Sequence, residues 1–229
     1  RIDRHYEEWN NIWNELSTPE SKAPAFKCMV GDIGSAGSED SSGPKMTQYP
    51  LNFWFCRNPG LALPLIALQY HEVKLKFTWG ANSDCGGGIE ESKVMCDYIY
   101  LDTDKRRRFA QVSHEYLIEQ VQRSKESVSS ARGDAKYRLN FNHPVKELVR
   151  RQKGTSNSGG DGDNSLAGSG NWQLKLNGHD RVAARDAKYF TRTQVWEHHS
   201  GAGGLDSQAG NNGAGRFNDS IAVYSFALK

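Results

Sequence analysis

The chain has 229 residues, of which 37% are hydrophobic and 24% charged, and this balance allows a hydrophobic core and excludes wholesale disorder. The 29 Lys and Arg residues against 27 Asp and Glu residues leave a net charge of +2, without the basic excess typical of proteins that bind nucleic acid or anionic membranes. The longest nearly uninterrupted apolar stretch, residues 60–68, contains Pro64 and is far shorter than the roughly 20 residues of a transmembrane helix.

Two segments have helical patterns. Tyr6, Trp9, Trp13 and Leu16 recur at three- and four-residue spacing, and Ser17-Thr18-Pro19 ends the pattern. Either Asp102 or Thr103 can cap a second, short helix that runs through Ala110.

Most of the remaining segments have the patterns of β-strands. In residues 72–79, apolar Val, Leu, Phe and Trp alternate with polar residues, which predicts a strand with one buried face. Such alternation, or an excess of β-branched and aromatic residues, predicts strands at 50–56, 72–79, 93–102, 137–141, 172–176 and 221–228. Strands do not alternate with long helices, so we predict an all-β protein with short helices in its loops.

Glycine and small polar residues gather in three segments, 31–43, 154–170 and 200–215. Because such segments bury little apolar surface, we expect them to be mobile loops that proteases cut first. A polar, Ser-rich break near Arg123–Asp134 predicts a linker at 126–135, between halves at 1–125 and 136–229.

The search for catalytic, metal-binding and cofactor-binding motifs is negative. The sequence has no nucleophile elbow, no phosphate-binding P-loop and no zinc-protease motif, so we predict no catalytic residue, metal site or cofactor. His198 and His199 would point to opposite faces of a strand, so a polar strand end is favoured over a metal site. His71 and His114 each precede a glutamate and are expected to make structural hydrogen bonds. Asn218 lies in the sole glycosylation sequon.

Three further patterns are weaker. The segment Asp161-Gly162-Asp163 begins like a calcium loop, but Leu166 and Trp172 stand where Gly and Glu are required. The four cysteines form no CxxC pair, and a Cys85–Cys96 disulfide is disfavoured. The basic run Lys105–Arg108 could contact nucleic acid, but with two aspartates beside it a solvated or salt-bridged helix face is favoured.

One long string, FWFCRNPGLALPLIALQYHEV at 53–73, resembles the major capsid proteins of the large nucleocytoplasmic DNA viruses, in the phycodnavirus, iridovirus and mimivirus range. Further similar strings follow in the family's order. They are DRHYEEWNNIWNEL (3–16), DYIYLDTDKRRRFAQVSHEYLIEQVQ (97–122), LNFNHPVKELV (139–149), LKLNGHDR (174–181), YFTRTQ (189–194) and VYSFALK (223–229).

The resemblance implies a double jelly roll, two eight-stranded antiparallel sandwiches in tandem, both incomplete in this chain. The first would be residues 1–125, lacking its N-terminal strands, and the second residues 136–229, lacking its C-terminal part. The family's proteins form homotrimers, pseudo-hexagonal capsomers that tile an icosahedral shell. Minor capsid or cement proteins and the penton are implied partners, nucleic acid is not, and contact with an inner membrane is left open. The implied location is the virion, with assembly in the host cytoplasm.

The same resemblance predicts the core and one departure from the family. Seven apolar residues of the long string and the strand after it are expected to be largely buried: Phe53, Phe55, Leu65, Ile66, Tyr70, Val73 and Leu75. Arg150-Arg151-Gln152 stand where the family continues with an apolar aromatic strand, so we expect that strand to end early or to lie exposed.

Three other functions remain as alternatives. The nearest is a double jelly-roll assembly scaffold, which would also form trimers and lattices. A jelly-roll carbohydrate-binding module would use loop aromatics such as Trp172 or Trp196. A cupin-type metalloenzyme would need a convergent His and Glu cluster inside one sandwich.

Overall fold

The computed structural model describes residues 2–30, 47–80, 91–126, 135–151, 166, 170–203 and 219–228. The contacts divide the chain into two compact units: unit 1 comprises Arg1–Asn52 with Gln120–Lys229, and unit 2 comprises Phe53–Glu119. Segment 31–43, Cys85 and Asn218 lie outside the described residues, as does nearly all of the expected linker at 126–135. The division into halves at 1–125 and 136–229 therefore stays a prediction.

Unit 1 begins with the predicted N-terminal helix, which is confirmed as α1 (Glu7–Ser17). Ile12 and Leu16 are buried on its apolar face, and the rings of Trp9 and Trp13 lie 5.4 Å apart beside them. A short 3₁₀ turn, η1 (Glu20–Lys22), follows Pro19 and leads into α2 (Ala23–Val30).

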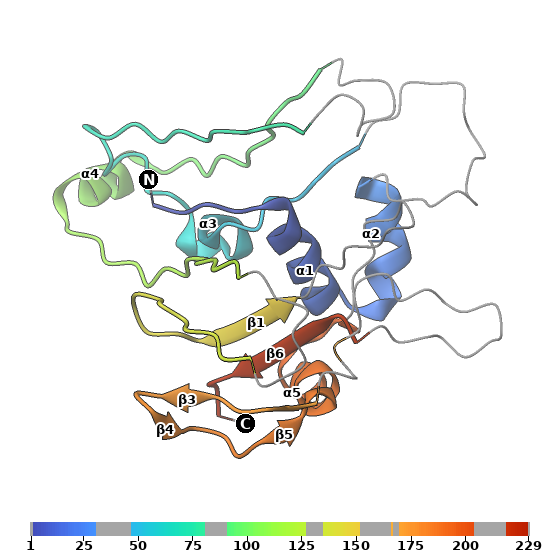
Figure 1. Cartoon of the computed structure of the whole chain (residues 1–229). Helices are drawn as coiled ribbons and strands as arrows, with labels where there is room; N and C mark the ends of the chain where they lie inside the picture. The colour runs from blue at the N-terminus through green and yellow to red at the C-terminus, as the bar shows by residue number, and fades with distance from the viewer. Residues whose placement is uncertain are drawn as a thin grey trace, which may run out of the picture. The chain divides into compact units, whose positions relative to one another are not determined.

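The centre of unit 1 is an antiparallel pair of strands, β1 (Glu147–Arg151) and β6 (Ile221–Ser225), with Val149 opposite Val223 (Figure 1). Successive side chains of a strand point to opposite faces, so β6 contributes to two apolar clusters. Ile221 and Val223 pack with Ile12 and Leu16 of α1 and with Val195. Ala222 packs with Leu166 and Phe190. The predicted buried strand at 221–228 is thus confirmed over Ile221–Ser225.

Between β1 and β6, the described chain forms small strand pairs and one helical stretch. β2 (Asn171–Trp172) pairs with β5 (Arg185–Asp186), and β3 (Lys175–Leu176) pairs with β4 (His179–Asp180). Asn177 and Gly178 close the second pair with φ of 52° and 85°, the left-handed values that a two-residue hairpin turn requires. The π-helical segment η4 (Tyr189–Thr193) then continues into α5 (Gln194–His198).

The segment that follows α5 caps the C-terminal end of α1. The last four carbonyls of a helix lack partners inside it. Here the backbone N–H groups of Gly201 and Gly203 donate to the carbonyl oxygens of Leu16 and Glu15, at 2.8 and 3.2 Å. The Ser200 hydroxyl donates to the Ser17 carbonyl at 2.8 Å. The expectation that 200–215 is mobile is therefore wrong for 200–203, because these bonds fix the segment to α1. Residues 204–215 lie outside the described residues.

Leu166 corrects a second loop expectation. It falls in segment 154–170, which we expected to be mobile, yet its side chain is fully buried against Phe190 and Ala222. Its backbone N–H donates to the Asp219 carbonyl at 2.7 Å. Leu166 itself is therefore held both by side-chain packing and by a backbone hydrogen bond. Apart from Leu166 and Gly170, that segment lies outside the described residues.

The strand that contains Arg150 does not lie exposed, contrary to one part of our expectation, because all five residues of β1 are half-buried. The residues after Arg151 lie outside the described ranges, so the expectation that the strand ends early stays a prediction. β1 continues through Arg151, and Arg150 lies opposite Ala222 of β6. The Arg150 guanidinium lies 4.2 Å from the centroid of Trp172 and 5.4 Å from that of Tyr137. Burial lowers the pKa of Arg150 below its usual value. The two aromatic faces compensate for part of the desolvation of this half-buried cation.

Unit 2 contains two α-helices in its described part, α3 (Trp54–Arg57) and α4 (Thr103–Gln111), with a 3₁₀ turn, η2 (Pro59–Leu61), after the first. α4 confirms the predicted second helix, and the Asp102 carboxylate accepts a hydrogen bond from the Thr103 N–H at 2.8 Å. α3 takes the place of the strand end expected at 54–56.

The expected strands at 72–79 and 93–102 are wrong for the described structure of unit 2. Both segments lie outside any strand pair, and every residue in 71–80 and 91–100 is exposed. A β-strand needs a hydrogen-bonded neighbour about 4.8 Å away, and the described residues supply none here. The segment at 137–141 of unit 1 likewise forms no strand.

The core expected in unit 2 is wrong for the same reason. The exposed fractions of Leu65, Tyr70, Val73 and Leu75 are 51%, 94%, 44% and 38%. Phe53, Phe55 and Ile66 are half-buried. The buried residue of this region is Trp54, in contact with the rings of Phe55 and Tyr116. An alternating sequence can bury its apolar face only when another layer covers that face.

Candidate functional site

The histidines singled out in the sequence do not form a reaction centre in the described residues. His71 is exposed, and His114 binds the Phe109 carbonyl oxygen at 2.9 Å, which is the structural role expected of it. Across the described ranges, no group of three or more His, Cys, Asp and Glu side chains is placed to hold a metal ion. The fragment of a calcium loop at 161–163 lies outside those ranges.

His198 and His199 end a helix, so the predicted strand end is wrong. His198 is the last residue of α5, and His199 is its C-cap. The His199 Nε2 lies 3.0 Å from a carboxylate oxygen of Glu147, and its imidazole meets the Trp13 ring edge-on at 6.3 Å. His199 therefore connects α5, β1 and α1 of unit 1, which is a structural role.

A buried carboxylate joins η4 to the start of β6. The Asp219 side chain is 5% exposed and accepts hydrogen bonds from Arg192 Nε at 2.8 Å and Arg192 Nη2 at 2.7 Å. It also accepts one from the Thr191 hydroxyl at 2.6 Å. The Arg192 hydrogen bonds, helped by that from Thr191, keep the pKa of Asp219 below its usual value despite burial. Paired in this way, Asp219 is a structural rather than a reactive carboxylate.

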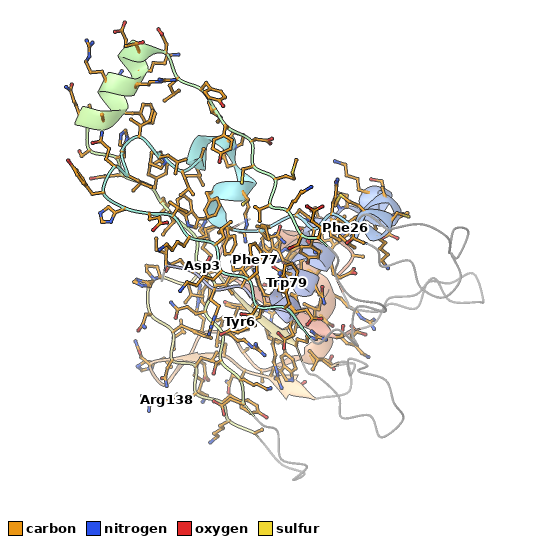
Figure 2. The ribbon with its side chains drawn as sticks, turned by 90° about the horizontal axis from the view of Figure 1, so that it is seen from above. Asp3, Tyr6, Phe26, Phe77, Trp79 and Arg138 are labelled. Atoms are coloured by element: carbon orange, nitrogen blue, oxygen red, sulfur yellow. The ribbon has the colours of Figure 1, made fainter. Side chains whose placement is uncertain are left out.

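A second polar cluster fixes the N-terminal segment of unit 1, where Figure 2 labels Asp3 and Tyr6. Asp3 lies 3.1 Å from the His5 Nε2 and accepts a backbone hydrogen bond from Arg4 at 2.8 Å. Burial opposes the ionisation of Asp3, but these hydrogen bonds outweigh it, and the pKa of Asp3 is lowered. Arg123 pairs with Glu8 at 2.9 Å and covers the Tyr6 ring at 4.5 Å.

Unit 2 presents a large amount of exposed apolar surface. Phe77 and Trp79, labelled in Figure 2, stack at 5.9 Å with interplanar angle 16°, yet they are 44% and 59% exposed. Exposed fractions for Tyr98, Ile99 and Tyr100 are 68%, 64% and 85%. Exposed apolar patches of this kind mark surfaces that other chains or segments cover. The sequence pattern predicted strands at 72–79 and 93–102 but did not predict that these aromatic residues are exposed.

The basic run predicted to be a solvated helix face lies on α4. All four of its cations, Lys105, Arg106, Arg107 and Arg108, are exposed. Arg106 Nε donates to the Leu101 carbonyl oxygen at 2.8 Å. No helix in the described ranges is both long and apolar enough to cross a membrane.

Comparison with known proteins identifies the chain's family. A model of the major capsid protein N-terminus matches residues 1–102, and a model of the large eukaryotic DNA virus major capsid protein matches residues 105–229. The chain belongs to the major capsid protein family of large eukaryotic DNA viruses. The resemblance seen in the sequence is therefore confirmed.

Individual members of the family agree with this assignment. The major capsid protein of Pyramimonas orientalis virus is 46% identical over 208 residues, which cover 87% of this chain and 50% of that protein. The major capsid protein of Paramecium bursaria Chlorella virus 1 is 34% identical, and the match covers 100% of this chain and 59% of that protein. The chain thus spans only part of the length of these relatives.

A solved structure supports the same fold. The quasi-atomic model of the PBCV-1 virus capsid matches with a TM-score of 0.61 and 26% identity, over 100% of this chain and 62% of that one. The chain therefore shares the fold of a viral capsid protein. Trp172, one of the aromatics named as examples for the carbohydrate-binding alternative, is half-buried and contacts Arg150 and Phe190.

Proposed function

We propose that this chain is the part of a major capsid protein that builds an icosahedral virus shell, without catalytic activity. Three copies of the whole protein form one pseudo-hexagonal capsomer, and capsomers tile the shell. The observation that carries the proposal is the pair of capsid family models, which together match nearly all of the chain. The relatives are named capsid proteins, which favours a structural role over an enzyme.

We also propose a double jelly roll, with halves at 1–125 and 136–229 joined at 126–135. The similarity to the PBCV-1 capsid over the whole chain supports it. The alternation in 72–79 supports it as well, since apolar residues at every second position suit a strand of a sandwich. In the complete sandwich, this segment and 93–102 pair with strands that the described residues do not contain.

The partners and location follow from the same proposal. The main partner is a second and third copy of the protein, followed by neighbouring capsomers. Minor capsid or cement proteins and the penton are further partners, and nucleic acid is not among them. The protein acts in the virion shell, and assembly takes place in the host cytoplasm. Asn218 remains the candidate glycosylation site.

Light scattering on the full-length protein tests the proposal. We expect a particle of three copies under assembly conditions. Leu75→Asp should abolish it, because in the proposed complete sandwich residues 72–79 form a strand whose apolar face, with Leu75, is buried, and the substitution would place a charge there. Lys76→Asp, a change at the neighbouring position on the opposite face, should leave the trimer intact. A stable monomer of the unsubstituted protein, or equal effects of both substitutions, would contradict it.

A further inference from the structure

Unit 2 has an open hollow beside α4. In Figure 2, α4 is the green helix, and its side chains point outwards from it. The hollow has a volume of about 400 Å³ and is lined by Lys105, Arg108, Phe109, Val112 and His114. The first four recur at helical spacing, so they share one face of α4 and the turn after it. Arg106 and Arg107 do not line the hollow.

The wall of the hollow is held in place before any ligand arrives. The rings of Phe109 and His114 stack at 4.9 Å with an interplanar angle of 27°. The His114 Nε2 lies 2.9 Å from the Phe109 carbonyl oxygen. Because a carbonyl only accepts hydrogen bonds, Nε2 carries the proton, and Nδ1 is the ring nitrogen that is not engaged in this bond. The stacked pair provides a rigid, largely apolar surface.

The residues that line the hollow carry positive charge, whereas the two nearby carboxylates on the same helix, Asp102 and Asp104, lie outside the lining. No acidic residue lines the hollow. Elsewhere in the described structure, Arg57, Arg123 and Arg192 each pair with a carboxylate within 2.9 Å. Lys105 and Arg108 make no such pair with any described residue. The helix dipole stabilises Arg108 in the last turn of α4, but its effect fades before Lys105, one turn earlier.

We propose that this hollow binds a phosphate monoester group, carried by a soluble phosphorylated small molecule or by the headgroup of a phosphoinositide lipid. The planar fork of Arg108 can donate two hydrogen bonds to phosphate oxygens, and Lys105 adds a point charge one turn away. Phe109, Val112 and His114 offer an apolar surface to the carbon skeleton that carries the phosphate. The hollow is open on one side, so it contacts the phosphate group and the atoms next to it and leaves the rest of the ligand in solvent.

Titration calorimetry of the full chain with inositol hexakisphosphate tests the site. The double variant Lys105→Gln/Arg108→Gln should bind at least about tenfold more weakly, because it removes charge-assisted hydrogen bonds. The matched variant Arg106→Gln/Arg107→Gln loses the same charge from the same helix and should keep its affinity within about threefold. Equal losses in the two variants, or no binding by the unsubstituted chain, would overturn the proposal.

Vesicles distinguish the two sources of phosphate. Phosphatidylcholine vesicles with and without phosphatidylinositol bisphosphate are sedimented with the chain and with each double variant. Sedimentation that needs the phosphoinositide and is lost only in Lys105→Gln/Arg108→Gln supports the lipid headgroup. Binding of inositol hexakisphosphate without sedimentation supports a soluble ligand. The unsubstituted chain is also titrated with a DNA oligonucleotide. If it binds this DNA more tightly than inositol hexakisphosphate, and both double variants lose that DNA affinity equally, the site is a diffuse basic patch and the proposal is overturned.

Discussion

Gly201→Ala is expected to lower the free energy of unfolding of the chain by about 2–4 kcal/mol. A Cβ at this position would overlap the carbonyl oxygen of Glu15 and lie 2.7 Å from the carbonyl carbon of Leu16. Neither atom can move away easily, because both belong to the backbone of α1. The segment would have to withdraw, and the hydrogen bonds of Gly201 and Gly203 to Leu16 and Glu15 would be lost.

Denaturant unfolding followed by circular dichroism measures this change. Ala202→Ser is the matched control, since Ala202 lies between the two glycines and is exposed. Its effect should stay within about 0.5 kcal/mol. If Gly201→Ala proved as mild as Ala202→Ser, the close approach of segment 200–203 to α1 would be refuted.

Asp219→Asn is expected to lower the free energy of unfolding by about 2–3 kcal/mol at neutral pH. An amide turns a donor group toward Arg192 or Thr191, where the native carboxylate accepts hydrogen bonds from both. The buried Thr191 hydroxyl and the Arg192 guanidinium then lose their charged acceptor, and the contact between η4 and the start of β6 is weakened. Asp180→Asn is the control, because Asp180 pairs with Lys175 on the surface at 3.1 Å, where both side chains are 55% exposed.

The effect of Asp219→Asn should depend on pH. The folded-state pKa of Asp219 is lowered relative to the unfolded chain. The carboxylate therefore contributes its stability above the unfolded value of about 3.9, and that contribution is lost as the pH falls through the folded value. The difference between native and Asp219→Asn chains should be constant near neutrality and shrink below about pH 4. A difference that grew toward acid pH would contradict the assignment of Asp219 as an ionised acceptor.

Local patterns predicted those elements whose partners lie in the described structure. The three- and four-residue spacing of Tyr6, Trp9, Trp13 and Leu16 predicted α1. Asp102 or Thr103 as a capping residue predicted α4, and the structure has Asp102 as the cap. The strand at 221–228 was predicted because apolar residues occupy both of its faces, and β6 is indeed covered on both. In these cases the packing agrees with the local preference.

The alternation of residues 72–79 alone could not show whether this segment forms a strand with a buried face. Alternation fixes which side chains share a face, but a neighbouring strand and a covering layer decide whether that face is buried. The same limit explains why Val73 and Leu75, which we expected in the core, are exposed.

Long-range polar contacts left weaker signals in the sequence. Nothing local to Gly201 or Asp219 shows that they meet α1 and η4, because their partners are far along the chain. By contrast, the dipeptide Asn177-Gly178 is a recognisable hairpin signal, and it could have placed β3 and β4 from the sequence. The basic run at 105–108 was visible, but only the helix shows that Lys105 and Arg108 line one hollow.

The central claim, that this chain builds a virus shell, is tested most directly by electron cryomicroscopy of the full-length protein under assembly conditions. We predict sheets or closed shells of pseudo-hexagonal blocks, each containing three copies with two sandwiches per copy. The density for this chain should follow the fold that it shares with the PBCV-1 capsid. Particles that remain single copies at every concentration, with no ordered lattice, would contradict the account.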